Sequence, residues 1–188
     1  MLSASQQRMD LTTRQKGGGQ AESPRRLRTL IIGMGNPILS DDAIGIILAT
    51  GLHKRLGDLP DVDVIEECCV GGLNLMDLMT GYDRLIALDS IKTIDGVPGT
   101  WYAFDATALR ETMNLRNVHD ANFATSLALG RQVGTHLPSD EECHIVAVEI
   151  AENMTFSEEL TPALQAALPA LRAEIEAHVL AILARDDA

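Results

Sequence analysis

Aromatic residues, basic residues and long hydrophobic runs are all scarce in this chain of 188 residues. Phe, Trp and Tyr make up 3% of it, so a core must be built from Leu, Ile, Val, Ala and Met. The formal net charge of −12 argues against binding to nucleic acid or to an anionic membrane, because both attract basic surfaces. No apolar run approaches the ~20 residues that a membrane-spanning helix needs. The composition therefore predicts a soluble, cytoplasmic protein with no nucleic-acid or membrane partner.

Cysteine is also rare. Cys68, Cys69 and Cys143 fit neither a disulfide framework nor the spacing of a metal knuckle. Buried free thiols are the simplest interpretation, and they agree with a reducing cytosol. The N-terminus carries arginines but no apolar segment, so it does not match a secretory signal.

The chain divides near residue 28. Residues 1–27 are polar, include Gly17-Gly-Gly19 and show no periodicity, which predicts a flexible extension. Six basic and two acidic residues lie within positions 1–28, so the acidic charge belongs to the remainder. With 46% hydrophobic residues overall, residues 28–188 are enough for a single α/β domain.

Apolar strands alternate with helical patterns throughout that domain. Strands are expected near residues 30–34, 61–66, 84–89, 100–104 and 143–148, and helices near 44–56, 73–79, 119–133 and from 161 onward. This alternation predicts a three-layer α/β sandwich: a mostly parallel twisted sheet with helices on both faces. The strand at 100–104 follows its predecessor too closely for a crossover helix, so we expect it to be antiparallel at an edge.

The most informative stretch follows the first strand. Gly33-Met-Gly35 has the start of a dinucleotide fingerprint, but Ile38 occupies the position of the third glycine. Asp41 and Asp42 then precede the helix, where a phosphate group would avoid competing anions. A nucleotide site is therefore disfavoured. The acids suit a bound cation, or they cap the helix, with Ser40 or Asp41 as its N-cap.

Three potential metal ligands fall at the same predicted edge of the sheet. Asp42 follows the first strand, Asp89 ends the third, and His119 begins a helix after a long loop. Two carboxylates and an imidazole form a reasonable partial ligand set for a first-row metal, with positions left for water or substrate. Each residue alone has an ordinary alternative as a cap or turn former. Their coincidence favours a site.

The same residues carry a resemblance to a known family. Three segments resemble, in the same order, motifs of the hydrogenase maturation endopeptidases. They are Gly33-Met-Gly35-Asn36-Pro-Ile-Leu-Ser-Asp41-Asp42-Ala-Ile-Gly45, His119-Asp-Ala-Asn-Phe-Ala-Thr-Ser-Leu-Ala-Leu-Gly130 and Phe156-Ser-Glu-Glu-Leu-Thr-Pro162. The similarity covers the whole domain but not residues 1–27. Two departures are Ser90, where alanine is common, and Gly71-Gly72, where Gly-Thr is often seen.

The resemblance implies an endopeptidase that removes the C-terminal extension of a nickel-loaded [NiFe]-hydrogenase large-subunit precursor. It implies that Asp42, Asp89 and His119 bind nickel, which the substrate protein supplies, and that no organic cofactor is needed. It also implies a monomer. Peptide cleavage has two possible routes: the nickel polarises the carbonyl or activates water, or a carboxylate such as Asp41 acts as general base. No serine or cysteine stands out as a nucleophile, since Ser40 and Ser90 have no histidine nearby in sequence.

A second hypothesis is a non-catalytic nickel-checkpoint or chaperone domain that binds the same precursor and leaves cleavage to another protein. A third, a nucleotide-binding α/β domain, depends only on Gly33-Met-Gly35. The motif series favours the processing endopeptidase.

Overall fold

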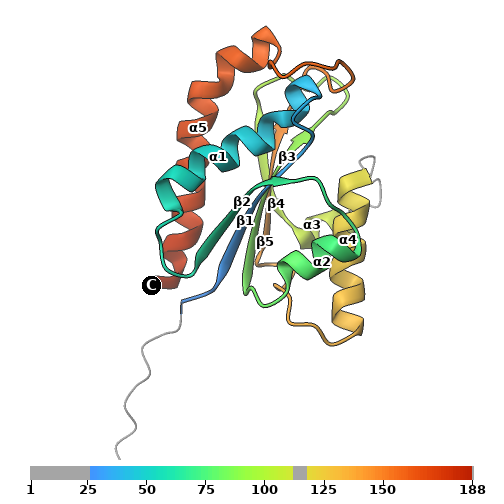
Figure 1. Cartoon of the computed structure of the whole chain (residues 1–188), viewed down its shortest axis with the longest axis vertical. Coiled ribbons are helices and arrows are strands. Elements are labelled where there is room, and N and C mark those ends of the chain that lie inside the picture. The colour runs from blue at the N-terminus through green and yellow to red at the C-terminus, as the bar shows by residue number, and fades with distance from the viewer. Residues whose placement is uncertain (1–25, 112–117, 188) are drawn as a thin grey trace, which may run out of the picture.

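The protein is built around a five-stranded sheet. The computed structural model describes residues 26–111 and 118–187 (Figure 1). The strands are β1 (Thr29–Met34), β2 (Val62–Cys68), β3 (Arg84–Ile91), β4 (Trp101–Asp105) and β5 (Cys143–Glu149). They lie in the order β2-β1-β3-β5-β4. Strands β2, β1, β3 and β5 are parallel, and β4 pairs antiparallel with β5 at the edge, as the sequence predicted.

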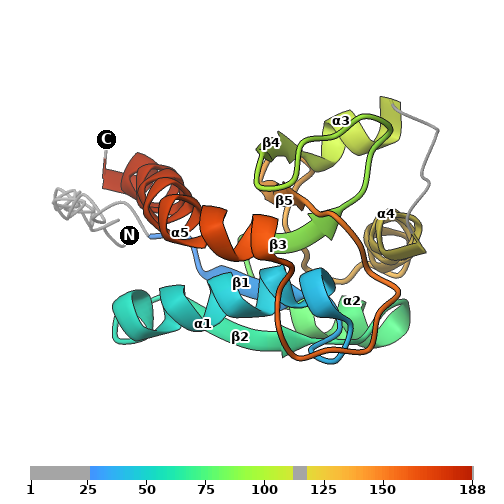
Figure 2. The ribbon, with the colours of Figure 1, turned by 90° about the horizontal axis from the view of Figure 1, so that it is seen from above.

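Helices cover both faces of this sheet. They are the short 3-10 turn η1 (Ser40–Ala43), α1 (Ile44–Leu56), α2 (Leu73–Met79), α3 (Ala106–Glu111), α4 (Val118–Gln132), α5 (Pro162–Leu183) and η2 (Ala184–Asp187). The view in Figure 2 shows α1 and α5 on one side of the strands and α2, α3 and α4 on the other. The predicted three-layer sandwich is confirmed.

Two apolar cores hold the layers together. Successive strand residues face opposite sides, so Ile31 packs with α1 and α5, whereas Leu30 and Ile32 pack toward α2 and α4. Every residue of β1 is buried, which explains why this strand reads as an unbroken apolar run. Within the part of the chain that the structure describes, no helix has the length and apolar character to cross a bilayer.

Some details differ from the sequence prediction. β3 continues two residues past Asp89, through Ser90 and Ile91. Neither Ser40 nor Asp41 caps α1: the residue at the N-cap of η1 is Leu39, and that of α1 is Ala43. Thr161 does precede α5, with Pro162 as the first helical residue. The predicted flexible extension, 1–27, falls almost entirely outside the described residues.

Candidate functional site

The loop after β1 is held against the sheet by glycines. Gly35 has a φ of 134°, and a Cβ there would lie 2.0 Å from the carbonyl oxygen of Asp42. On α1, a Cβ at Gly45 would lie 2.3 Å from the oxygen of Met34 and 2.4 Å from that of Leu88. These positions therefore exclude any larger residue, and α1 crosses directly over the ends of β1 and β3. Gly33, which with Gly35 resembled a phosphate loop, also packs against Gly45 and Ala49 of α1, so it serves close packing of helix and strand.

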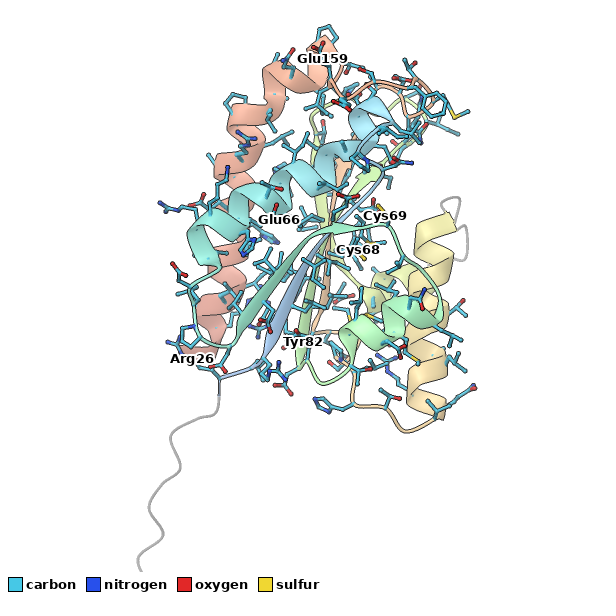
Figure 3. The ribbon with its side chains drawn as sticks, in the orientation of Figure 1. Arg26, Glu66, Cys68, Cys69, Tyr82 and Glu159 are labelled. Carbon is cyan, nitrogen blue, oxygen red and sulfur yellow. The ribbon has the colours of Figure 1, made fainter. Side chains whose placement is uncertain are left out.

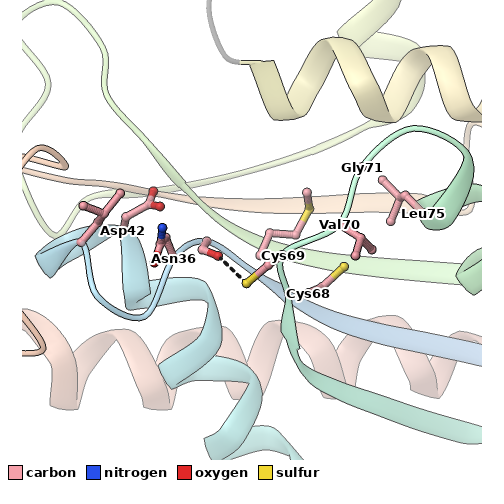
Figure 4. A pocket seen from close by; sticks show the side chains of 10 residues that line it. Asn36, Asp42, Cys68, Cys69, Val70, Gly71 and Leu75 are labelled. Carbon is pink, nitrogen blue, oxygen red and sulfur yellow. Dashed lines mark hydrogen bonds between the residues drawn. The ribbon is translucent and has the colours of Figure 1, made fainter.

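A pocket of about 320 Å³ opens at this carboxyl edge (Figure 4). One wall is the segment between β1 and α1, which contributes Asn36, Leu39 and Asp42. The other wall is the β2–α2 loop, whose lining residues are Cys68, Cys69, Val70 and Gly71. The Sγ of Cys69 lies 3.4 Å from the carbonyl oxygen of Gly35, as the dashed line in Figure 4 marks, and joins the two walls. Parallel α/β sheets commonly bind ligands at such an edge.

Ser90 donates a hydrogen bond to each of the carboxylates of Asp42 and Asp89. The Ser90 hydroxyl donates a hydrogen bond of 2.6 Å to Asp42 Oδ1, and the Ser90 N–H donates one of 2.8 Å to Asp89 Oδ1. Both carboxylates are mostly buried, at 8% and 6% exposure. Among the residues that the structure describes, Asp42 Oδ2 receives no hydrogen bond, so this oxygen has lone pairs available to a ligand of the pocket.

His119 lies in the first turn of α4. This helix leads into β5, which is parallel to β3, so α4 begins on the side of the sheet where β3 ends. Its side chain is not among those that the structure describes. Within the described residues, no group of three or more His, Cys, Asp and Glu side chains is close enough to hold a metal ion. The ligand set of Asp42, Asp89 and His119 therefore stays a prediction.

Asp41 is placed differently from its neighbour. Its side chain has 0% exposure, and its carboxylate accepts hydrogen bonds from the N–H groups of Ala151, Glu152 and Thr161 and from the Thr161 hydroxyl, at 2.7–3.4 Å. Four donors saturate a carboxylate that has about four lone-pair sites. Asp41 therefore ties the start of α1 to the start of α5, and we do not retain it as a general base.

The cysteines of the pocket favour the protonated thiol. Burial is the main cause that raises the pKa of Cys68, and the negative charge of Asp89 adds to the rise. Burial and a hydrogen bond with Glu67 raise the pKa of Cys69. A nucleophilic cysteine needs the opposite, an electropositive setting that lowers its pKa. All three cysteines are free, as predicted, although Cys69 is exposed rather than buried.

Sequence reasoning missed two parts of this site. One is Ser90, which was noted as a departure from a family pattern and set aside as a nucleophile. The alternation of side chains along β3 turns it toward Asp42. The other is the pair Cys68 and Cys69, treated as inert thiols, which form part of a pocket wall. Ser90 lies at the end of β3, and the two cysteines lie at the end of β2. This position at the carboxyl ends of parallel strands could have indicated that these residues belong to the site.

Comparisons with known proteins agree with this architecture. A family model described as "Hydrogenase maturation protease" matches residues 46–178. The chain is 30% identical over 156 residues to the hydrogenase 2 maturation protease of Escherichia coli (strain K12), covering 78% of this chain and 92% of that protein.

Solved structures give the same result. The hydrogenase maturating endopeptidase HybD from E. coli superposes with a TM-score of 0.62 at 26% identity, over 79% of this chain and 90% of that one. An endopeptidase from E. coli solved in solution gives a TM-score of 0.64 at 26% identity, over 85% and 93% of the two chains. The fold, the motif order and these matches agree: this chain belongs to the hydrogenase maturation protease family.

Proposed function

We propose that this protein is the endopeptidase that removes the C-terminal extension from the nickel-loaded large-subunit precursor of a [NiFe]-hydrogenase, in the cytoplasm and as a monomer. The observation that carries the proposal is the pair of buried carboxylates, Asp42 and Asp89, joined through Ser90 beside the pocket at the carboxyl edge of the sheet. Family membership supports the reaction class, and the carboxylate pair supports a site at this edge of the sheet.

Asp42 and Asp89 would act together with His119 as a partial ligand set. Hard carboxylate oxygens and one imidazole suit a divalent first-row metal, and so few ligands suit a metal that arrives already held by the substrate. Such a metal polarises a carbonyl or activates water when bound. The role of this chain is then to hold the precursor so that its scissile peptide bond lies against the pocket.

Ser90 gives Asp42 a fixed orientation in this proposal. Its hydroxyl donates to Oδ1 at 2.6 Å, and Oδ2 remains for a ligand of the pocket that Asp42 lines. Fixing the carboxylate before the substrate binds reduces the conformational entropy lost on binding. Because the thiols of Cys68 and Cys69 favour the protonated form and Asp41 is saturated with donors, we favour water as the nucleophile over a covalent route.

Intact-mass measurement tests the proposal directly. The precursor, in its nickel-loaded and its nickel-free form, is incubated with the wild-type chain and with the Asp42→Asn variant. We expect loss of a C-terminal peptide only from the nickel-loaded form and only with the wild-type chain. Stable binding without a mass change would favour the alternative, a non-catalytic checkpoint domain. Equal cleavage of the nickel-free form would disprove nickel recognition.

A further inference from the structure

Large apolar side chains are unusually exposed beside the candidate site. Met154 and Phe156, in the loop between β5 and α5, are 82% and 80% exposed. Ile38, in the segment between β1 and η1, is 47% exposed. A single exposed apolar residue is ordinary, but a group on adjoining segments points to an interaction surface.

Backbone hydrogen bonds join the two segments. The Ser157 N–H donates to the Ile38 carbonyl at 3.0 Å, and the Ser40 N–H donates to the Ser157 carbonyl at 2.7 Å. The two stretches also form a parallel bridge between Leu39 and Ser157. Figures 1 and 2 both show the β5–α5 loop alongside the start of α1. We call the surface formed by Ile38, Met154 and Phe156 the apolar platform.

The loop that carries the platform is held in place. Asp41 accepts hydrogen bonds from its two ends, at Ala151 and Thr161. Glu152 Oε2 accepts hydrogen bonds of 3.0 Å from the N–H groups of Met154 and Thr155. A surface that is already ordered loses less conformational entropy on binding than a loop that must fold onto its partner.

The platform is continuous with the pocket. Leu39 and Asp42 line the pocket, while Ile38, between Leu39 and the preceding turn, belongs to the platform. Across the pocket, Val70 is 37% exposed and lines the opposite wall. A protein whose tail enters the pocket must therefore rest its folded body on the rim, and the platform is the apolar part of that rim next to Asp42.

Charge around the platform restricts the partner. The loop 150–161 contains Glu152, Glu158 and Glu159 and no basic residue. Glu159 lies near the start of α5 in Figure 3. A complementary surface has an apolar centre with Lys or Arg at its margin. A symmetric contact between two copies of this chain would instead bring the same glutamates together, which is unfavourable.

We propose that the apolar platform of Ile38, Met154 and Phe156 is the docking surface for the folded body of the large-subunit precursor. The contacting patch of the precursor is apolar, has a basic margin and adjoins the C-terminal extension. This inference depends on the proposed function for the identity of the partner. The platform sets affinity for the precursor, and the pocket residues carry out cleavage.

The test compares Met154→Ser/Phe156→Ser with Val133→Ser, whose apolar side chain is also exposed, at 65%, but follows α4 on the opposite edge. Trimming of the nickel-loaded full-length precursor is measured over a range of concentrations, and binding to the same immobilised precursor is measured separately. We expect the double variant to raise KM and Kd at least about tenfold with little change in kcat, because two exposed apolar side chains become polar. The Val133→Ser control should match the wild type.

The outcomes separate the two proposals. If the double variant keeps the wild-type KM and Kd, the docking surface is wrong while the processing function stands. If the wild type binds without trimming and the double variant loses binding, the docking surface stands and the proteolytic function is wrong. A wild-type chain that fails to bind the precursor overturns both. A concentration-dependent dimer, abolished by the double variant at unchanged KM, would assign the platform to self-association and overturn the inference.

Discussion

The amino and carboxyl edges of the sheet differ in the partners of their polar side chains. At the amino edge, polar side chains pair with one another: Arg84 with Glu142 at 2.6 Å, Arg131 with Asp140 at 2.6 Å and the His136 ring with the Asp83 carboxylate at 3.0 Å. At the carboxyl edge, Asp41, Asp42 and Asp89 are buried with hydroxyl and N–H donors, and apolar side chains lie exposed. Figure 3 places Tyr82 and Arg26 at the first edge and Glu159 at the other.

This contrast indicates that the two edges have different roles. Ion pairs and hydrogen bonds at the amino edge, including Tyr82 with Asp63 at 2.9 Å, satisfy their charges internally. Asp42 receives its hydrogen bond from a hydroxyl group rather than from a basic side chain, and exposed apolar groups gain free energy only when a partner covers them. The amino edge therefore stabilises the fold, whereas the carboxyl edge, apart from Asp41, carries the groups that the proposed function assigns to ligand binding.

The largest effect should come from the carboxyl edge. Asp42→Asn is expected to reduce trimming by about a thousandfold or more, roughly 4 kcal/mol in the activation free energy, because the amide carries no charge for the metal. The free energy of unfolding should change by less than about 1 kcal/mol, since the amide oxygen can still accept the Ser90 hydrogen bond. Intact-mass kinetics and urea denaturation check both values. Trimming at the wild-type rate would remove Asp42 from the site.

A second variant separates Asp41 from Asp42. Asp41→Asn should lower the free energy of unfolding by about 3 kcal/mol, because an amide nitrogen would face N–H and hydroxyl donors in a fully buried place. Chemical denaturation measures the loss. If Asp41→Asn instead kept wild-type stability and abolished trimming, Asp41 would return as a catalytic group.

The amino edge is tested by Arg84→Met. Arg84 is 2% exposed and donates to Glu142 and to the Ile182 carbonyl. Its loss should cost about 2 kcal/mol of stability, less than the ~3–5 kcal/mol of a fully buried pair, because Glu142 remains accessible to water. Trimming per folded molecule should be unchanged. A large fall in kcat with unaltered stability would contradict the division between the edges.

Ser90→Ala removes a hydroxyl that orients Asp42. The hydrogen bond of 2.6 Å is lost, but the carboxylate keeps its charge. We expect about a tenfold slower trimming reaction, roughly 1.4 kcal/mol, with the backbone bond to Asp89 retained. Threonine at this position keeps the hydroxyl and should restore much of the rate. Failure of Ser90→Thr to do better than Ser90→Ala would rule out orientation as the role of the hydroxyl.

The smallest expected effect is a change in pH dependence near the amino edge. Burial lowers the pKa of His144, and the opposing attraction of Glu142 does not reverse this. The folded state therefore holds the ring neutral, while the unfolded chain takes up a proton as the pH falls through about 6.5. Stability should decline as the pH falls below that value. His144→Gln should flatten this decline between pH 7 and 5.5 in denaturation curves, and an unchanged slope would contradict it.

The sequence was sufficient for the five strands and for α1, α2, α4 and α5, but it predicted neither α3 nor the side-chain partners. Hydrophobic patterns indicated the strands, because burial on one or both faces leaves a repeating pattern, and the short connection before β4 indicated its antiparallel pairing. The prediction that Asp41 caps the helix was wrong. An acid before a helix is typical of a cap, but the donors that Asp41 binds are 110 and 120 residues away. Contacts at such separation leave no local pattern. For the same reason Ser90 looked like a neutral replacement until β3 placed it against Asp42.

The hydrogen bond between Asp41 and Thr161 also has a consequence for the order of assembly. It closes a stretch of 120 residues. A ribosome needs on the order of ten seconds to add that many residues, and the first native donor to the Asp41 carboxylate, Ala151, is added only after 110 of them. Until these donors are made, the turn that carries Asp42 lacks the hydrogen bonds that hold it to the segment before α5. A newly made chain therefore completes the candidate site only once this C-terminal segment is available.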